Sequence, residues 1–166
     1  MLQKLTKLTH VLMLGFAKFL ILFAGLAISF SVFSFSAFAL DYRSIAPAKA
    51  ISYDAPSKEA SKLYILGGGY PVEVIVNLGD WIKVRDSQGG LSWVESKSLS
   101  TKRTVLVLAK TDIKAAEDAT SALVATIEKD VVLELVAGGA NNNWVKVKHR
   151  DGLTGFVQVD KLWGSN

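Results

Sequence analysis

The chain alternates short apolar runs with turn residues from position 51 to its end. The runs recur every eight to twelve positions, a spacing that is typical of small all-β domains. Only the segment 114–129 (KAAEDATSALVATIEK) has a composition that favours a helix. Its place relative to the other runs predicts a loop followed by a strand, and a helix across the whole segment is the alternative.

Two runs show the two-residue period of a strand with one buried face. In VEVIV, we expect Val72, Val74 and Val76 to be buried together. In WIKV, we expect Ile82 and Val84 to lie in a core, which places Trp81 on the opposite face. The segment 40–50 carries no such pattern and is interpreted as a lead-in.

The second of these patterns occurs twice. DWIKVRDSQGGLSWV (80–94) matches NWVKVKHRDGLTGFV (143–157), and the first tryptophans, Trp81 and Trp144, are 63 residues apart. The DSQGG segment has the glycines that a hairpin turn between strands requires. The repeat predicts two copies of one small β-domain, at residues 40–103 and 104–166.

The first 39 residues differ from the rest. Basic residues but no acidic ones precede an apolar stretch at 19–39, which ends in Ala37–Phe38–Ala39. A basic start, an apolar centre and an A-x-A ending are typical of a secretory signal peptide. We therefore predict cleavage after Ala39 and a periplasmic or secreted protein. The alternative is a retained N-terminal membrane anchor, because the apolar stretch is just long enough to span a bilayer.

Removal of this segment changes the charge of the chain. The full chain has 19 Lys and Arg against 15 Asp and Glu, a net charge of +4. Three of the basic residues precede position 40, so 16 remain against 15, a net charge of +1. Without a basic patch, a nucleic-acid partner is not expected. The chain has no cysteine, so neither disulfides nor lipid attachment at a cysteine can occur.

The residues beyond position 39 offer little for catalysis. There is no cysteine nucleophile, and the one histidine, His149, is expected in a surface turn, where no triad or multi-histidine zinc site can form around it. Gly67–Gly69 lacks the spacing of a phosphate-binding loop. We expect no enzyme activity and no cofactor.

The stretch GYPVEVIVNLGDWIKVRDSQGGLSWV (69–94) resembles the bacterial SH3-like domain, often called SH3b. The matching features are a glycine before a Pro-Val-x-Val strand, a Trp-x-x-Val strand and a closing aromatic-Val strand. The resemblance extends over 42–162 and is greatest to small exported proteins with two such domains. It implies two tandem small β-barrels after the signal peptide. Ser92 stands where the second copy has Gly155, the glycine that the family pattern expects.

The tryptophans are the candidate ligand contacts. An outward aromatic ring beside a cation suits a peptide or glycan groove, and Trp81 is accompanied by Lys83 as Trp144 is by Lys146. The other candidates are aromatic residues or proline in the same two copies: Tyr70, Pro71, Trp93 and Phe156. Of the two tryptophans, Trp81 is favoured, because we expect Pro56 and Tyr70–Pro71 to wall its groove. The alternative is that the tryptophans cover a barrel mouth or the contact between the copies.

These observations predict an exported, non-enzymatic binding module. By resemblance, its ligand is a peptidoglycan peptide or an envelope protein, with no membrane attachment after cleavage. The alternative is a structural or accessory subunit of an envelope complex that binds no cell wall. The sequence leaves the oligomeric state open.

Overall fold

The computed structural model describes residues 40–138 and 143–165, which belong to one compact unit. The predicted signal peptide and most of the Asn141–Asn143 turn lie outside the described residues. Within the described part of the chain, no helix is both long and apolar enough to cross a membrane.

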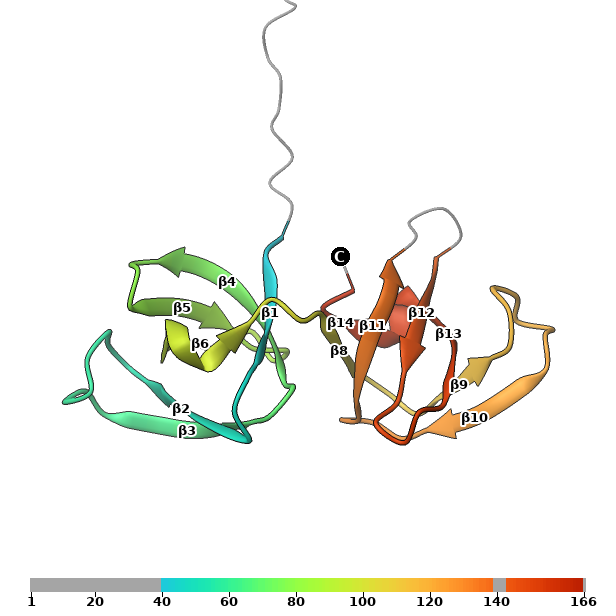
Figure 1. The fold of residues 1–166 in the computed structure, drawn as a ribbon, viewed down its shortest axis with the longest axis horizontal. Coiled ribbons are helices and arrows are strands. Elements are labelled where there is room, and N and C mark those ends of the chain that lie inside the picture. The colour runs from blue at the N-terminus through green and yellow to red at the C-terminus, as the bar shows by residue number, and fades with distance from the viewer. Residues whose placement is uncertain (1–39, 139–142, 166) are drawn as a thin grey trace, which may run out of the picture. The chain divides into compact units, whose positions relative to one another are not determined.

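Two antiparallel sheets of seven strands each make up the fold (Figure 1), which confirms the all-β prediction. The first sheet, here called the first domain, contains β1 (Tyr42–Ile45), β2 (Lys49–Tyr53), β3 (Lys62–Gly67), β4 (Pro71–Asn77), β5 (Trp81–Arg85), β6 (Leu91–Glu95) and β7 (Leu99–Ser100). Its strand order is β3-β2-β6-β5-β4-β1-β7, and a 3₁₀ turn, η1 (Ser96–Ser98), precedes β7.

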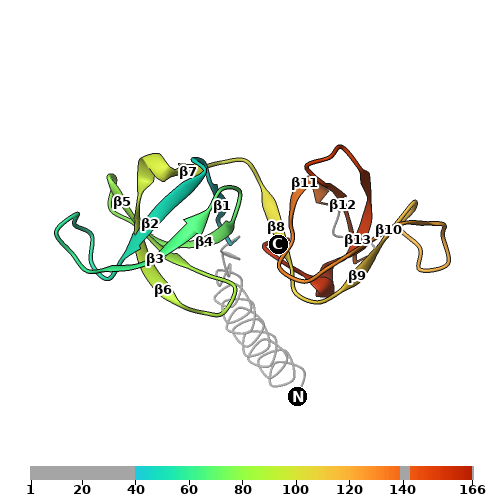
Figure 2. The same ribbon diagram turned by 90° about the horizontal axis from the view of Figure 1, so that it is seen from below.

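The second sheet, the second domain, repeats this topology (Figure 2). It contains β8 (Thr104–Val107), β9 (Thr111–Lys114), β10 (Leu123–Ile127), β11 (Val132–Gly138), β12 (Trp144–Lys148), β13 (Thr154–Gln158) and β14 (Leu162–Trp163). The order β10-β9-β13-β12-β11-β8-β14 is that of the first sheet with each label raised by seven, and η2 (Val159–Lys161) matches η1. The repeated sequence therefore corresponds to a repeated sheet.

Three segments bear on the expected boundaries. The strands of the two sheets end at Ser100 and begin again at Thr104, and the boundary predicted between residues 103 and 104 stays a prediction. The supposed lead-in at 40–50 is wrong, because it contains β1 and the start of β2. Segment 114–129 forms a loop and then β10, as the favoured interpretation predicted.

Each domain has its own apolar core. Ile82 and Val84 of β5 are each 1 % exposed, and their counterparts Val145 and Val147 are buried in the second domain, so the predicted buried face is confirmed. Cross-strand partners complete the layer: Val94 lies opposite Ile82 and Val157 lies opposite Val145. Alternation in β5 and β12 thus directs every second side chain into a core.

Strand β4 departs from the expected alternation. Val72 is fully buried, but Val76 is 39 % exposed and Glu73 is only 6 % exposed. The register with β5 shifts between Val74 and Val76, where one extra residue is accommodated. A bulge of this kind reverses the faces beyond it. The buried Glu73 carboxylate is compensated by Arg85, whose Nη1 lies 3.3 Å away.

Candidate functional site

Trp81 opens β5 on the face opposite the core residues Ile82 and Val84, and it is half-buried. The ring of Tyr53, at the end of β2, packs edge-on against it with 5.3 Å between ring centroids and an interplanar angle of 89°. This arrangement is the favoured geometry of an aromatic pair, and it fixes the indole plane. The expectation that Trp81 lies outside the core is confirmed.

A groove of about 420 Å³ lies beside this indole. Three segments line it: the loop between β2 and β3, the end of the turn before β5, and the end of β6 with η1. The lining residues are Pro56, Ser57, Lys58, Glu59, Asp80, Trp81, Glu95, Ser96 and Lys97. An apolar floor of proline and indole is thus surrounded by charged side chains.

Local hydrogen bonds hold the walls of the groove in place. The loop is closed at its base, where the Asp54 N–H donates to the Ser61 carbonyl (3.1 Å) and the Ser61 N–H donates to Asp54 Oδ1 (3.0 Å). On the other side, the Ser96 N–H donates to the carbonyl of Asp80 at 2.8 Å. The groove is therefore built on backbone that the fold itself fixes.

Glu95 is the centre of the charge arrangement. Lys97 Nζ lies 2.8 Å from its carboxylate and Lys58 Nζ lies 3.6 Å away, so one carboxylate holds two lysines. The hydrogen bond from Lys97 lowers the pKa of Glu95, and the same bond raises the pKa of Lys97. The hydroxyl of Ser57 donates to Glu59 and lowers the pKa of that carboxyl. Both carboxylates are therefore held in the charged form.

Lys83 and Trp93 lie next to the groove and are not part of its lining. They face each other across β5 and β6, and Lys83 Nζ lies 5.8 Å from the centre of the Trp93 ring. The same register places Glu95 opposite Trp81. Lys83 and Trp93 therefore extend the outer face that carries Trp81.

Tyr70 and Pro71 lie elsewhere and do not wall this groove. Tyr70 packs against the core, and its hydroxyl is 2.9 Å from Ser87 Oγ in the hairpin turn. Pro71 is fully buried at the start of β4. The expectation that they wall the Trp81 groove is wrong, because Tyr70 packs on the core and Pro71 pairs with Ser44 of β1, and neither residue lines the groove. Whether either residue contacts a ligand stays a prediction.

The matching residues of the second domain are arranged differently. Trp144 is only 9 % exposed, although it is not a member of the core cluster, so the expectation of an exposed ring is wrong. Lys146 lies over the Phe156 ring at 5.9 Å, as Lys83 does over Trp93. In the place of Tyr53, which pairs with Trp93, Lys114 pairs with Phe156. The second domain thus keeps the cation over the ring but loses the tyrosine that supports the tryptophan.

The sequence interpretation missed the charged rim of the groove. Glu95 could have been found, because the DSQGG hairpin register places it directly opposite Trp81. Nothing in the sequence singles out Lys58 and Glu59, since the loop that carries them has no regular alternation of apolar and polar residues. No group of three or more His, Cys, Asp or Glu side chains that could hold a metal occurs among residues 40–138 and 143–165.

Comparison with known proteins gives one family and several structures. The model of the bacterial SH3 domain matches residues 46–101 and 114–164. No curated protein matches. NlpC1 from Trichomonas vaginalis shares 16 % identity (TM-score 0.36), over 78 % of this chain and 47 % of that one. An NlpC/P60 family protein from Bacillus cereus shares 14 % (TM-score 0.34), over 74 % and 55 %. This chain spans about half the length of these proteins.

Proposed function

The chain belongs to the bacterial SH3 domain family, and we propose that it is an exported, non-enzymatic module whose first domain binds a peptide in the groove beside Trp81. The family matches fall on the two SH3 domains, which are binding modules in general. The proposed ligand is a peptide of the cell wall or an extended segment of an envelope protein.

The groove is the observation that carries this proposal. A half-buried indole, fixed by Tyr53, offers a flat apolar surface to a ligand at small entropic cost. Pro56 adds a rigid apolar wall. Backbone and side-chain polar groups of the loop and of η1 surround this surface, as expected for a site that binds a short peptide.

The charge of the rim favours a ligand that brings a cation. Two lysines and three carboxylates line the groove, an excess of one negative charge. Both lysines are engaged by Glu95, whereas Asp80 has no ion-pair partner within the described part of the chain. An ammonium group beside Asp80 would also lie near the indole, whose face attracts cations. We therefore expect a lysine-like amine in the ligand to strengthen binding.

The test is retention of the purified protein on cell-wall sacculi and on envelope extracts. Trp81→Ala is expected to abolish retention, and Trp93→Ala is the matched control, because Trp93 lies on the same face outside the groove. Acetylation of the amines in the sacculi should weaken binding. Equal retention of the parent and Trp81→Ala, with both proteins folded, would exclude the groove as the binding site.

A second function, that of an accessory subunit without a wall ligand, is favoured by the edge of the first sheet. Strand β3 pairs only with β2, and its Ile65 is 66 % exposed opposite Ile51, which is 38 % exposed. The same pair in the second domain is polar, since Thr126 donates a hydrogen bond to Asp112 at 2.9 Å. An exposed apolar pair on an edge strand suits a protein partner.

This alternative makes a different prediction for the same experiment. If it holds, sacculi should not retain the parent protein, and co-purification of an envelope protein should depend on Ile65. The change Ile65→Thr, which copies the second domain, should then abolish co-purification while Trp81→Ala has no effect.

A further inference from the structure

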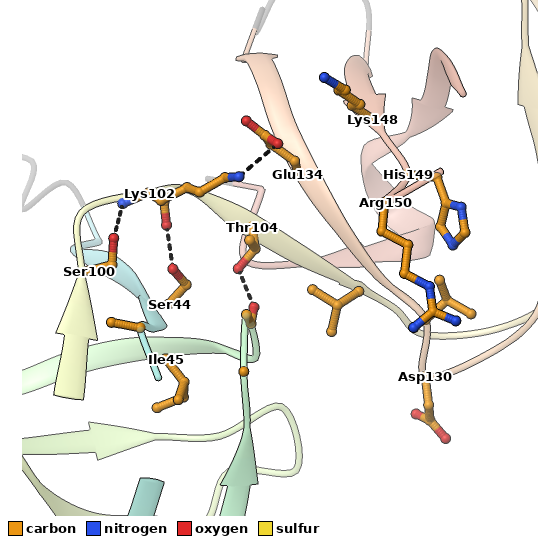
Figure 3. A pocket seen from close by; sticks show the side chains of 15 residues that line it. Ser44, Ile45, Ser100, Lys102, Thr104, Asp130, Glu134, Lys148, His149 and Arg150 are labelled. Atoms are coloured by element: carbon orange, nitrogen blue, oxygen red, sulfur yellow. Dashed lines mark hydrogen bonds and ion pairs between the residues drawn. The ribbon is translucent and has the colours of Figure 1, made fainter. Parts of the chain in front are cut away.

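A second hollow, a cleft of about 870 Å³, is lined by residues of both domains (Figure 3). Bonds join its walls: Ser44 Oγ donates to the carbonyl of Lys102 at 2.8 Å, and Lys102 Nζ lies 2.8 Å from the Glu134 carboxylate. Figure 3 shows Lys148 and Arg150 at opposite ends of the cleft, so its cations do not converge on a ligand. The cleft therefore joins the two domains, whereas one edge of the first sheet has no such partner among the described residues.

Strand β3 forms this free edge, since it pairs with β2 on one side and with no described strand on the other (Figure 1). Three consecutive apolar residues of β3 are exposed: Leu63 by 46 %, Tyr64 by 39 % and Ile65 by 66 %. On β2, Ile51 lies opposite Ile65 and is exposed as well. An uncharged apolar edge strand is a template on which a further strand can pair.

The matching edge of the second domain is polar and charged. Thr126 stands at the place of Ile65. Glu128 stands at the place of Gly67, and its carboxylate pairs with Lys110. Charged side chains are a common means of keeping a sheet edge from pairing with another chain. The same topology thus forms with a charged edge, so the fold itself does not require the apolar edge of β3.

The backbone of Ile65 is directed towards the free edge. The residues that bond towards β2 are Tyr64, whose N–H donates to Ser52 Oγ at 3.3 Å, and Gly68, whose N–H donates to the carbonyl of Ala48 at 2.8 Å. In an antiparallel pair, every second residue directs its N–H and C=O to the same neighbouring strand. Because Tyr64 faces β2, the N–H and C=O of Ile65 face outward.

We propose that β3 pairs antiparallel with β3 of a second copy of this chain, about a two-fold axis at Ile65. This axis sets Ile65 opposite its own copy, so that the two Ile51–Ile65 pairs form one row of four isoleucines. It also sets Leu63 of one copy opposite Gly67 of the other, where an added Cβ would meet nothing within 4 Å. A two-fold dimer uses the same patch on both copies and therefore needs a strand that is complementary to itself, as β3 is.

The charge of the strand favours the antiparallel arrangement. Lys62 is the only charged residue in β3. In the proposed register the two Lys62 side chains lie six residues apart along the strands, about 20 Å, which is more than a Debye length. In a parallel pair they would lie side by side and repel each other.

The size of the contact indicates a weak dimer. The exposed parts of the four apolar side chains amount to about two whole side chains, on the order of 400 Å² per copy, where a standard interface buries about 800 Å² per partner. We therefore expect a dissociation constant on the order of 100 µM. The dimer does not depend on peptide binding beside Trp81, because β3 lines no part of that groove.

The first experiment is sedimentation equilibrium of the purified exported protein, without ligand, from micromolar to millimolar concentration. We expect a monomer at the low end and a dimer at the high end. Ile65→Lys places two like charges face to face on the axis and should abolish the dimer, and Ile65→Thr, which copies the second domain, should weaken it about tenfold. Leu123→Lys, on the exposed edge strand of the second domain, is the matched control and should dimerise like the parent. Both positions are exposed, so the variants should melt like the parent.

A second experiment tests the register. A mixture of Ile65→Lys and Ile65→Glu should associate, although neither variant does so alone, because only a two-fold axis at this residue sets the two charges opposite each other. The chain has no cysteine, so a disulfide in Ile65→Cys must join two copies. Opposed residues of a hydrogen-bonded pair have Cα atoms about 5.5 Å apart, which a disulfide can span. Ile65→Cys should therefore oxidise to a dimer readily, and Leu123→Cys should not.

The proposal is overturned if the parent is monomeric at millimolar concentration, if Ile65→Lys leaves the dimer unchanged, or if the mixture of Lys and Glu variants fails to associate. A monomeric parent that co-purifies with an envelope protein through Ile65 would assign this edge to a different protein. Trp81→Ala should dimerise like the parent whatever its effect on retention by sacculi, so that failure of the dimer and failure of the proposed function are separate results. Loss of the dimer in Trp81→Ala would place the contact at the groove and would also overturn the proposal.

Discussion

The two domains share a topology but differ at a pair of buried positions. In the first domain, Ser52 and Ser92 are buried, with exposures of 0 % and 2 %. The corresponding residues in the second domain are Ile113, which is in the core cluster, and Gly155. One domain fills the space with two small side chains, and the other fills it with one large side chain against a glycine. Similar volumes thus support the same backbone with different sequences.

The surfaces of the two domains differ more than their cores do. The rim of the Trp81 groove carries Lys58, Glu59, Asp80, Glu95 and Lys97. At the places of Asp80 and Glu95, the second domain has Asn143 and Gln158, which lie against Trp144 in the same hairpin register. The comparison indicates that the two domains present different surfaces on a common scaffold.

The largest loss of stability is expected when a residue of this buried pair in one domain is replaced by its counterpart from the other domain. A Cβ at Gly155 would clash with Ile113 Cγ2 and lie 2.7 Å from the Lys114 carbonyl oxygen. Gly155→Ser should therefore destabilise the second domain by about 3 kcal/mol, the upper part of the range for overpacking. Denaturant unfolding followed by NMR peaks of each domain measures this. The added change Ile113→Ser, which copies the first domain, should restore part of the loss.

The reverse change checks the comparison. Ser92→Gly removes no clash and should cost the first domain less than about 1 kcal/mol, mostly backbone entropy. If Gly155→Ser proved as mild as Ser92→Gly, the coupling of the two buried positions would be refuted.

A smaller loss of stability, similar in both domains, is expected when the matching core valines, Val84 and Val147, are truncated. Val84 and Val147 are 1 % and 0 % exposed. Truncation of either to alanine should cost about 2 kcal/mol, because a buried branched side chain leaves a partial cavity. Lys83→Ala and Lys146→Ala, their neighbours on the outer face, are the controls. Thermal melting of the four variants shows whether the two cores contribute equally to stability. An unchanged melting temperature of Val84→Ala would contradict the assignment of Val84 to the core.

The sequence was most informative where its period was regular. Alternation in WIKV and WVKV gave the buried valines, and the repeat at an interval of 63 residues gave two domains of one topology. The predicted alternation failed at β4, because a bulge interrupts the two-residue period and no residue type in the sequence marks the bulge.

The site was predicted less well than the fold. The outward position of Trp81 follows from alternation, but alternation does not predict that Trp144 is only 9 % exposed. The rim charges are on a loop and at strand ends that come together only through pairing of β5 with β6 and closure of the loop at Asp54 and Ser61. The hairpin register predicts Glu95, but the loop that carries Lys58 and Glu59 reaches the same place through the pairing of β2 with β6, which no local pattern encodes.

A moderate loss of stability is expected when the contact between the domains is weakened. The Trp163 ring packs edge-on against Tyr42 of the first sheet, with 5.2 Å between centroids. Trp163 thus lies at the contact between the two copies, and for Trp81 and Trp144 that alternative stays a prediction. Such a pair contributes about 0.5–1.5 kcal/mol. Trp163→Ala should lower the melting temperature modestly and loosen the domains, seen as a larger radius of gyration in solution scattering. Trp93→Ala, which removes a ring outside this contact, should leave the radius unchanged.

The smallest expected effect is a shift in the pKa of Glu134. It tests most directly whether Glu134 pairs with Lys102, where the matching Glu73 pairs across the strands with Arg85. The hydrogen bond from Lys102 lowers the pKa of this carboxyl, and the charges of Lys102 and Lys148 act in the same direction. A carboxyl with a lowered folded pKa adds stability above its unfolded pKa, about 4.3, and loses it as the pH falls through the folded value. The contact of Lys102 with the second domain should therefore weaken only in acid. In a ¹³C titration of the side-chain carboxyl, Lys102→Gln should raise the midpoint of Glu134 towards the ordinary value, and Lys148→Gln should raise it less. A larger effect of Lys148→Gln would mean that Glu134 pairs across the strands as Glu73 does with Arg85, and not with Lys102.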